Sequence, residues 1–360
     1  MDNTAIVSLD DLGYYSEYDR YIKENGFGVF ETGRISRHDR ELYSVITTRG
    51  AFRAEITGNM RYSAEAKSDF PVVGDWVLMI EYDGSYIIRE ILPRKTLLAR
   101  KAVDEFGEEQ LIASNIDYAF IVQSPDNNFN LNRLERYMAV AYTGGIIPIL
   151  ILNKCDLLEP GLLEDLLSEV NRRIHGLEVL TTSTVSKGGI DPIKRIMQKR
   201  RSYCLLGSSG VGKSSLVNKL VEGSNIRTTS ISSSTGKGKH TTSHRELFLT
   251  DGGSILIDTP GMRELGIGDG DEGLTHTFNQ ITQIATGCSF DDCTHNDEPG
   301  CAVQEAVIKG DIEADLLANY HKLVKESKHY QSTIAEKRKS DREFGKMCRN
   351  AMKFRKNNKF

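Results

Sequence analysis

A glycine-rich segment in the second half of the chain has the spacing G-x-x-x-x-G-K-S of a phosphate-binding loop. Its residues are Gly207, Ser208, Ser209, Gly210, Val211, Gly212, Lys213, Ser214 and Ser215. In such a loop the backbone N–H groups curl around a phosphate, and the N-terminus of the following helix adds partial positive charge. We expect Lys213 to reach the β and γ phosphates of a nucleotide and the hydroxyl of Ser214 to bind Mg²⁺. An apolar run before the segment and a helical stretch after it argue against a chance match.

A second motif indicates which nucleotide is bound. Asn153-Lys154-Cys155-Asp156 follows an apolar run and resembles the Asn-Lys-x-Asp motif of GTPases. The carboxylate of Asp156 can accept hydrogen bonds from N1–H and the N2 amine of guanine. Adenine lacks that pair of donors, so ATP would leave a buried carboxylate unpaired. The motif therefore favours GTP and GDP, although a polar turn at a strand end is the alternative when the motif is taken alone.

Two further segments match GTPase motifs less completely. Ser183-Thr184 ends the next expected strand, where GTPases carry a Ser-Ala pair that contacts the guanine oxygen; the threonine departs from that pattern. Asp258-Thr259-Pro260-Gly261 resembles Asp-x-x-Gly, in which Asp258 would hold a Mg²⁺-bound water and the N–H of Gly261 would sense the γ-phosphate.

The residue after this last motif bears on catalysis. Many GTPases place there a glutamine that orients the attacking water, but this chain has Met262, whose thioether cannot do so. We expect a low intrinsic rate and a different catalytic group. His240 is the candidate, because an imidazole can accept a hydrogen bond from water; a mobile loop residue or an RNA-phosphate contact is an equal alternative. Thr241 or Thr242 is expected to bind Mg²⁺.

The order of these motifs is unusual. In most GTPases the phosphate loop comes first and Asn-Lys-x-Asp last, whereas here Asn153–Asp156 precedes the loop at Gly207. The sequence is therefore circularly permuted. The segment after Asp258, which corresponds to switch II, then leads at about Gly266 into the C-terminal part of the chain rather than back into the sheet.

Three cysteines and a histidine form a cluster of metal-ligand type. They are Cys288, Cys293, His295 and Cys301. A Cys₃His set suits one tetrahedral Zn²⁺, and four protein ligands leave no open position, so the metal should be structural. Asp291 or Asp292 as a ligand, or three unrelated buried cysteines, are the alternatives. We expect a reducing compartment, in which disulfides are improbable.

Composition and periodicity indicate how these motifs are positioned. The 360 residues suffice for two or three domains, and no run of about 18 apolar residues or N-terminal signal segment is present, so we expect a cytoplasmic protein without a membrane span. Short strands are expected at 29–35, 42–48, 51–56, 75–82 and 85–91, which favours a small closed barrel such as an OB-fold or another small β domain. Apolar runs at 117–123, 146–152, 177–182, 203–206 and 254–257, with helical stretches between several of them, indicate a parallel α/β sheet.

The C-terminal tail is strongly basic. Residues 337–360 hold ten Lys or Arg against two acids, a net +8, while the whole chain carries −4. Phe344, Phe354 and Phe360 interleave with these charges. This pattern favours an RNA-binding arm, with a solvated tail as the alternative. On the expected barrel, a second candidate RNA surface comprises Arg34, Arg37, Arg49, Arg53, Arg61 and Lys67.

Together the motifs resemble the small-ribosomal-subunit-dependent GTPase A family. The order Asn153–Asp156, phosphate loop, Gly238–Thr242, Asp258–Gly261 and the cysteine cluster carries this resemblance, and Gly58–Arg61 and Ser68–Trp76 extend it to the barrel, so that it covers roughly residues 30–325. It implies an N-terminal OB-fold β-barrel, a circularly permuted P-loop GTPase α/β domain and a C-terminal helical zinc-binding domain. The expected divisions are 1–27 (extension), 28–111 (barrel), 112–268 (GTPase), 269–336 (zinc) and 337–360 (tail).

The resemblance also implies an activity and partners. These are slow GTP hydrolysis stimulated by the small ribosomal subunit, binding to that subunit and its rRNA, and a role in its late maturation, with release coupled to hydrolysis. We expect a monomer. It also points to His240 as the catalytic group. Two other functions compete: a metabolic P-loop kinase or ATPase, for which no acceptor-substrate motif is recognisable, and a nucleotide-gated rRNA-binding scaffold with negligible hydrolysis, which Met262 makes a serious rival.

Overall fold

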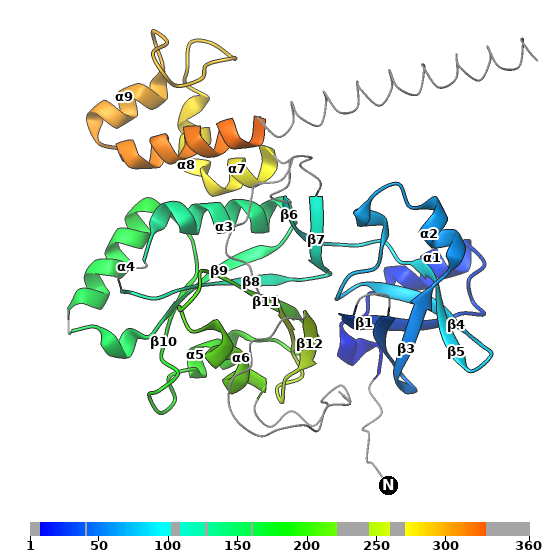
Figure 1. Ribbon diagram of the computed structural model, residues 1–360. Coiled ribbons are helices and arrows are strands. Elements are labelled where there is room, and N and C mark those ends of the chain that lie inside the picture. Colours follow the sequence, from blue (N-terminus) through cyan, green and yellow to red (C-terminus); the bar gives the residue numbers. More distant parts are fainter. Residues whose placement is uncertain are drawn as a thin grey trace, which may run out of the picture.

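The computed structural model describes residues 8–39, 42–101, 109–126, 129–159, 161–221, 245–259 and 271–328. Their elements form an N-terminal barrel, a central α/β unit and a C-terminal helical unit (Figure 1). His240, Thr241, Thr242, Gly261, Met262 and the basic tail lie outside these residues. Within the described ranges, no helix is both long enough and apolar enough to cross a membrane.

Five strands close into a small barrel. They are β1 (Glu31–Asp39), β2 (Leu42–Thr47), β3 (Gly50–Ile56), β4 (Trp76–Tyr82) and β5 (Ser85–Ile91). Closure follows because β1 pairs with both β2 and β4, and β5 pairs with both β3 and β4. Alternate residues such as Ile35, Val45 and Val77 fill the interior. Helix α2 (Gly58–Ser63), capped by the Thr57 hydroxyl, joins β3 to β4. The expected closed barrel is confirmed.

The N-terminal segment, for which the sequence indicated no element, packs onto the barrel. It forms the short helix η1 (Asp10–Leu12) and helix α1 (Glu17–Glu24). Leu12 and Tyr18 are buried, and the rings of Tyr14 and Tyr18 lie 5.0 Å and 6.3 Å from the ring of Trp76. The segment is held by aromatic contacts with residues far along the chain, which no local periodicity records.

The central unit is built on a parallel sheet with helices on both faces. Its parallel strands are β8 (Tyr118–Gln123), β9 (Ile147–Asn153), β10 (Val179–Thr182), β11 (Ser202–Leu206) and β13 (Ile255–Asp258), in the spatial order β10-β9-β8-β11-β13. Helices α3 (Leu131–Thr143) and α4 (Leu162–Arg173) cover one face, and α5 (Asp191–Ile196) and α6 (Lys213–Val221) cover the other (Figure 1). All five parallel strands coincide with the apolar runs of the sequence, because strands buried on both faces are apolar throughout.

The barrel and the central sheet are hydrogen-bonded to each other. Strand β12 (Glu246–Leu249) pairs antiparallel with β13 and also with β1, through Arg37 opposite Glu246, which makes one sheet of eleven strands. A separate hairpin, β6 (Leu97–Lys101) and β7 (Glu109–Ser114), lies between the two units. The sequence did not predict β6, β7 or β12.

Arg34 forms hydrogen bonds with several chain segments where the barrel meets the central unit. The side chain is 1% exposed, and its guanidinium donates to the carbonyls of Leu12 (2.6 Å), Gly74 (3.1 Å) and Asn115 (2.8 Å) and to Ser202 Oγ (3.0 Å). The prediction that Arg34 is available to RNA is wrong. Burial between four chain segments makes it a structural residue instead.

The C-terminal unit rests on α3. It contains α7 (Asp271–Thr277), α8 (Asn279–Ala285), α9 (Ala302–Lys309) and a helix over 314–328. At Gly273 a Cβ would meet Ala139 O, so only glycine permits this approach of α7 to α3. Arg173 on α4 then pairs with Glu135 on α3 and with Asp315 on the last helix, at 2.6 Å each.

Candidate functional site

The phosphate loop lies at the carboxyl end of β11, in the middle of the parallel sheet. Gly207, Gly210 and Gly212 have φ values of 146°, 85° and 98°, which side chains with a Cβ rarely adopt. A Cβ on Gly207 would also meet the carbonyl of Val122. Helix α6 begins directly after the loop, at Lys213. The glycines are therefore required by the backbone path that joins the strand to the helix.

The side chain of Lys213 folds back over the loop. Its Nζ donates to the carbonyl oxygens of Gly207 and Ser208, at 2.6 Å in each case. These carbonyls are neutral acceptors, whereas phosphate oxygens are charged and form shorter, stronger bonds with an ammonium group. The ammonium group is thus already held at the loop, where it could exchange its carbonyl acceptors for phosphate oxygens.

Asn153 links the second motif to the phosphate loop. Its side chain is fully buried, and its Nδ2 donates to the carbonyl of Val211 at 2.8 Å. Its Oδ1 accepts from the hydroxyl of Thr182 at 3.1 Å, at the end of the neighbouring strand β10. One amide therefore holds the ends of β9 and β10 and the phosphate loop in place relative to one another. Thr182 was not singled out from the sequence, because its partner lies 29 residues away.

The rest of this motif follows the carboxyl end of β9. Lys154 has a left-handed backbone (φ 68°), and its Nζ lies 3.9 Å from Asp126 Oδ2. Asp156 is exposed, within the short helix η3 (Cys155–Leu157). The thiol of Cys155 donates to the carbonyl of Leu152 at 3.1 Å, and burial raises the pKa of Cys155. Cys155 is therefore a packed thiol, while the Asp156 carboxylate is open to a ligand.

The two weaker motifs also lie at the carboxyl edge of the sheet. The hydroxyl of Ser183 accepts hydrogen bonds from the N–H groups of Val185 (3.2 Å) and Ser186 (3.1 Å), so this side chain shapes its own loop and Thr184 follows at the strand end. Asp258 ends β13, which is the immediate neighbour of β11. The buried hydroxyl of Thr259 donates to the carbonyl of Leu205 at 3.0 Å and anchors this segment; no local sequence pattern predicts this role.

The cysteine cluster has the dimensions of a zinc site. The ligand atoms of Cys288, Cys293, His295 and Cys301 all lie within 4.8 Å of one another. His295 Nδ1 is 3.6 Å from the sulfurs of both Cys288 and Cys301, and those sulfurs are 3.9 Å apart. Tetrahedral Zn²⁺ with Zn–S of about 2.3 Å and Zn–N of about 2.0 Å requires roughly 3.5 Å between S and N and roughly 3.8 Å between two sulfurs. The donor set therefore suggests zinc.

The surroundings of the cluster shift the pKa values of two ligand side chains toward their metal-binding forms. Burial acts to raise the pKa of Cys288, but backbone N–H groups of Val303 and Ala302 at the start of α9 outweigh it and hold that pKa below its usual value. Burial lowers the pKa of His295, which favours the neutral imidazole that binds metals. Gln304 donates from Nε2 to the carbonyl of His295 at 2.7 Å and holds its backbone, whose φ is 60°.

The fold and these sites define a class of protein. A parallel sheet with a phosphate loop after β11 and an Asn-Lys-x-Asp segment earlier in the chain, after β9, is a circularly permuted P-loop GTPase. A model of the RsgA GTPase family matches residues 91–268, and a model described as "50S ribosome-binding GTPase" matches residues 202–335.

Individual relatives extend the match to nearly the whole chain. The "Small ribosomal subunit biogenesis GTPase RsgA 1" of Bacteroides thetaiotaomicron is 39% identical over 350 residues, 96% of this chain and 97% of the relative. The RsgA of Methanosarcina acetivorans is 39% identical, with 91% and 89% covered. The crystal structure of YjeQ from Thermotoga maritima matches 83% of this chain and 99% of its own, with 25% identity and a TM-score of 0.63. YloQ, described as a circularly permuted GTPase, matches 84% and 96%, with 25% identity and a TM-score of 0.60. The chain belongs to the RsgA GTPase family.

Proposed function

We propose that this protein binds the small ribosomal subunit and hydrolyses GTP during its late maturation, at a rate that the subunit stimulates. The observation that supports the GTPase assignment most directly is the bond from Asn153 to Val211, because it joins the base-recognition segment to the phosphate loop. The ribosomal assignment is supported by relatives named small ribosomal subunit biogenesis GTPases, which match almost the full length of the chain.

Each described motif then has a role in binding Mg²⁺-GTP. The N–H groups of the phosphate loop and the ammonium of Lys213 hold the phosphates, the hydroxyl of Ser214 binds Mg²⁺, and Asp258 holds a Mg²⁺-bound water. Asp156 accepts the two guanine N–H groups. Ser183 and Thr184 border the base, with the Ser183 hydroxyl already committed to its own loop.

Hydrolysis depends on residues outside the described part of the chain. We assign the positioning of the attacking water to His240 and the second Mg²⁺ contact to Thr241 or Thr242, while the N–H of Gly261 contacts the γ-phosphate. Met262 cannot orient water, so basal turnover is slow and the bound subunit raises it. Loss of the γ-phosphate removes its contact with Gly261, which couples hydrolysis to release of the protein.

The remaining parts serve binding to the subunit. The barrel (28–111) and the basic tail (337–360) contact rRNA, and the GTPase domain spans 112–268. The described residues of the extension (1–27), from Ser8 on, pack on the barrel. The domain at 269–336 is held by one structural zinc ion. The protein acts as a monomer.

One assay tests the proposal. Phosphate release from GTP is measured for the protein alone, with purified small subunits and with purified large subunits. We expect stimulation by small subunits alone, and its loss in Lys213→Ala, which removes a charge-assisted phosphate contact contributing several kcal/mol to the transition state. Equal stimulation by both subunits would contradict the assignment of the small subunit as the partner.

The competing function is a GTP-gated rRNA-binding scaffold, which Met262 favours. In that case the protein would bind small subunits in the presence of GTP, but phosphate release would stay at the level of Lys213→Ala with or without subunits. Competition for a labelled guanine nucleotide by GTP and not by ATP excludes a metabolic ATPase.

A further inference from the structure

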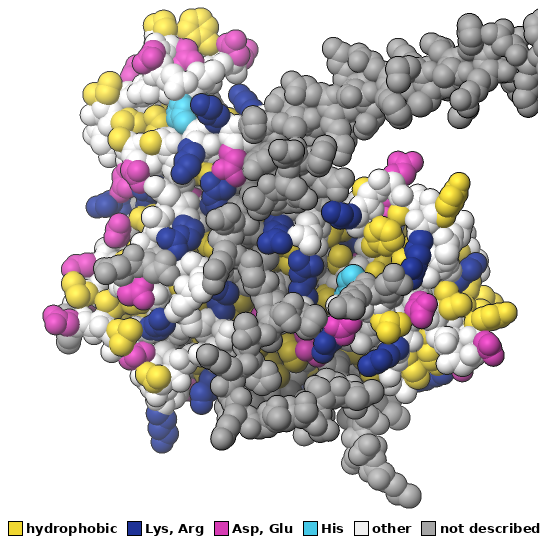
Figure 2. All heavy atoms as spheres, in the orientation of Figure 1, with side chains coloured by type: hydrophobic (Ala, Val, Ile, Leu, Met, Phe, Trp, Pro, Cys, Tyr) yellow, Lys and Arg dark blue, Asp and Glu magenta, His cyan; other side chains and the backbone are white. Residues whose placement is uncertain are grey.

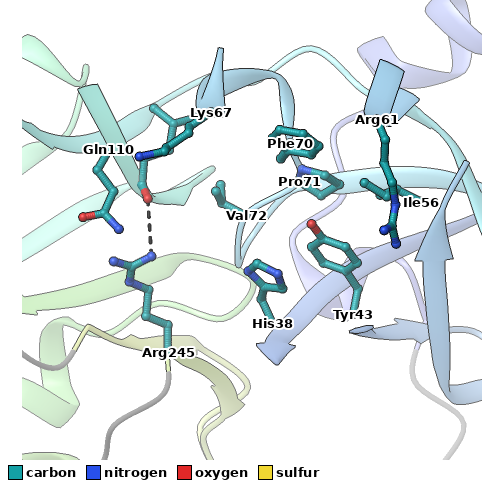
Figure 3. Close-up of a pocket in the computed structure, with 11 residues that line it drawn as sticks. His38, Tyr43, Ile56, Arg61, Lys67, Phe70, Pro71, Val72, Gln110 and Arg245 are labelled. Carbon is teal, nitrogen blue, oxygen red and sulfur yellow. Dashed lines mark hydrogen bonds between the residues drawn. The ribbon is translucent and has the colours of Figure 1, made fainter. Parts of the chain in front are cut away.

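A cavity of about 520 Å³ lies at the junction of the barrel and the central unit. Its lining residues come from β1, β2, the end of β3, the segment between β3 and β4, β7, and Arg245 just before β12 (Figure 3). None of them belongs to the phosphate loop or to the base-recognition segment. The cavity is therefore separate from the GTP site, and its volume is in the range of small-ligand sites.

The lining is cationic. It contains Arg61, Lys67 and Arg245 and no Asp or Glu. Arg245 is the deepest of the three cations: burial, with a smaller contribution from the nearby Arg100, lowers its pKa, and its guanidinium donates to the carbonyl of Leu111 at 3.3 Å. An anion beside Arg245 would offset both the burial and the repulsion. Lys and Arg side chains also gather on the surface between β7 and the barrel (Figure 2).

The same cavity presents flat rings. The rings of His38 and Tyr43 stack with centroids 4.4 Å apart and an interplanar angle of 5°. Figure 3 shows these two rings, with Phe70 and Pro71, on the side of the cavity opposite Lys67, Gln110 and Arg245. Burial raises the pKa of Tyr43 to about 12, so its hydroxyl stays protonated at neutral pH and can donate a hydrogen bond.

A ligand that satisfies both sides must carry a planar ring and a negative charge a short distance apart. Inorganic phosphate would leave the rings without a partner, and the acidic side chains of a peptide, Asp and Glu, have no ring to stack. A nucleotide has both parts, and RNA-binding proteins commonly hold an unstacked base against aromatic side chains. The amide of Gln110 supplies a donor and an acceptor for the edge of a base.

We propose that this cavity binds one unstacked nucleotide of single-stranded RNA, with its base against the His38–Tyr43 pair and its phosphate at Arg245 and Lys67. The choice of RNA over a free nucleotide rests on the proposed ribosomal function. It is supported by the open rim of the cavity, where Arg61 and Lys67 are exposed and can hold the phosphates of neighbouring nucleotides.

The test uses the full-length protein loaded with a non-hydrolysable GTP analogue. A fluorescein-labelled ten-nucleotide RNA of mixed sequence, containing one 4-thiouridine, is titrated and followed by anisotropy. The variants are His38→Ala and Lys67→Gln. The matched control is Arg89→Gln, which also removes one exposed positive charge but lies on β5, a strand that contributes no residue to the cavity.

We expect His38→Ala and Lys67→Gln each to weaken RNA binding about tenfold, Arg89→Gln to weaken it less than threefold, and binding of labelled GTP to stay unchanged in all three. Irradiation should crosslink the 4-thiouridine to peptides that contain Tyr43 or Phe70. Equal effects of the three substitutions, or crosslinks confined to other peptides, would overturn the proposal.

Two further results distinguish failure of the cavity proposal from failure of the proposed ribosomal function. If free mononucleotides displace the RNA at equal concentration, the cavity is a small-molecule site and RNA is the wrong source. If the oligonucleotide results are as expected but small subunits neither bind the protein nor stimulate phosphate release, the cavity assignment stands and the proposed ribosomal function fails.

Discussion

A single amide, that of Asn153, shows why the residue type matters at the centre of the site. It must donate to a carbonyl, that of Val211, and accept from a hydroxyl, that of Thr182. Aspartate at this position would set a carboxylate oxygen against the Val211 carbonyl, and neither group could donate. The amide satisfies both partners in a buried place where an unmatched polar group costs about 1–3 kcal/mol.

Asp156 tests the choice of base at the same scale. Asp156→Asn should weaken GTP binding by about 3 kcal/mol, roughly 100-fold, because two charge-assisted hydrogen bonds are lost. The same substitution should strengthen the binding of xanthosine triphosphate, whose C2 carbonyl can accept a hydrogen bond from the new amide. Competition of both nucleotides against a fluorescent guanine nucleotide measures this. Asp165→Asn, which neutralises an exposed carboxylate on α4, should leave the preference as it is. An unchanged preference in Asp156→Asn would mean that another residue reads the base.

The site residues differ in how far the sequence reveals them. Residues whose chemistry demands a fixed type and spacing, such as Lys213, Asp156 and Cys293, stand out because short motifs carry them. Thr182 and Thr259 do not, since each acts through one hydroxyl bonded to a strand that is distant in sequence. The burial of Arg34 was unpredictable for the same reason: its four acceptors come from four separate segments.

Secondary-structure elements also differ in how well the sequence predicts them. Strand β5 occupies the predicted range Ser85–Ile91, because alternation and flanking turn residues bound it. Strand β1 was expected at 29–35 but runs over Glu31–Asp39, since its charged second half gains partners from β2 that composition does not report. Strands β6, β7 and β12 were missed. They are short and mixed in polarity, so pairing with distant strands stabilises them more than their own sequence does.

The contact between α3, α4 and the last helix depends on one arginine of an adjacent pair. Arg173 is 3% exposed and bonds Glu135 and Asp315, whereas Arg172 is 70% exposed and bonds Glu313. Arg173→Ala should lower the free energy of unfolding by about 3–5 kcal/mol, because Glu135 would be left charged and buried. Arg172→Ala should cost less than about 1 kcal/mol. Urea unfolding of both variants measures the difference; equal losses would show that Glu135 does not depend on Arg173.

The metal cluster should control the stability of its own helices. The purified protein is expected to hold one zinc ion per chain, and Cys293→Ser or a strong chelator should loosen the C-terminal unit first, since binding free energy is folding free energy in such sites. Elemental analysis and hydrogen exchange resolved by segment provide the measurements. Amides of α8 and α9 should lose protection while those of β8 and β9 keep it. Native protein without zinc and with three freely reacting thiols would contradict the assignment.

At the scale of the whole molecule, the described units are joined by buried polar contacts as well as by apolar ones. Arg34 holds the N-terminal segment, the barrel and β11 at one point, and Tyr18 donates to the carbonyl of Pro93 at 3.0 Å. Because these groups are buried, separating the units would leave several of them without hydrogen bonds. The barrel and the central unit should therefore unfold in one transition.

The pairing of β1 with β12 covers a sheet edge of the central unit. A sheet edge with unpaired N–H and C=O groups is a template for another chain, and proteins protect such edges. In the described part of this sheet, β1 covers the edge that β12 would otherwise present. A chain shortened to begin at residue 92 should keep the nucleotide motifs and yet associate edge to edge, which light scattering at rising concentration would detect. Phe248→Lys, which puts a charge on β12, should restore monomers to the shortened chain. If the shortened chain stays monomeric without it, the edge is harmless; otherwise the barrel also acts as a guard against self-association.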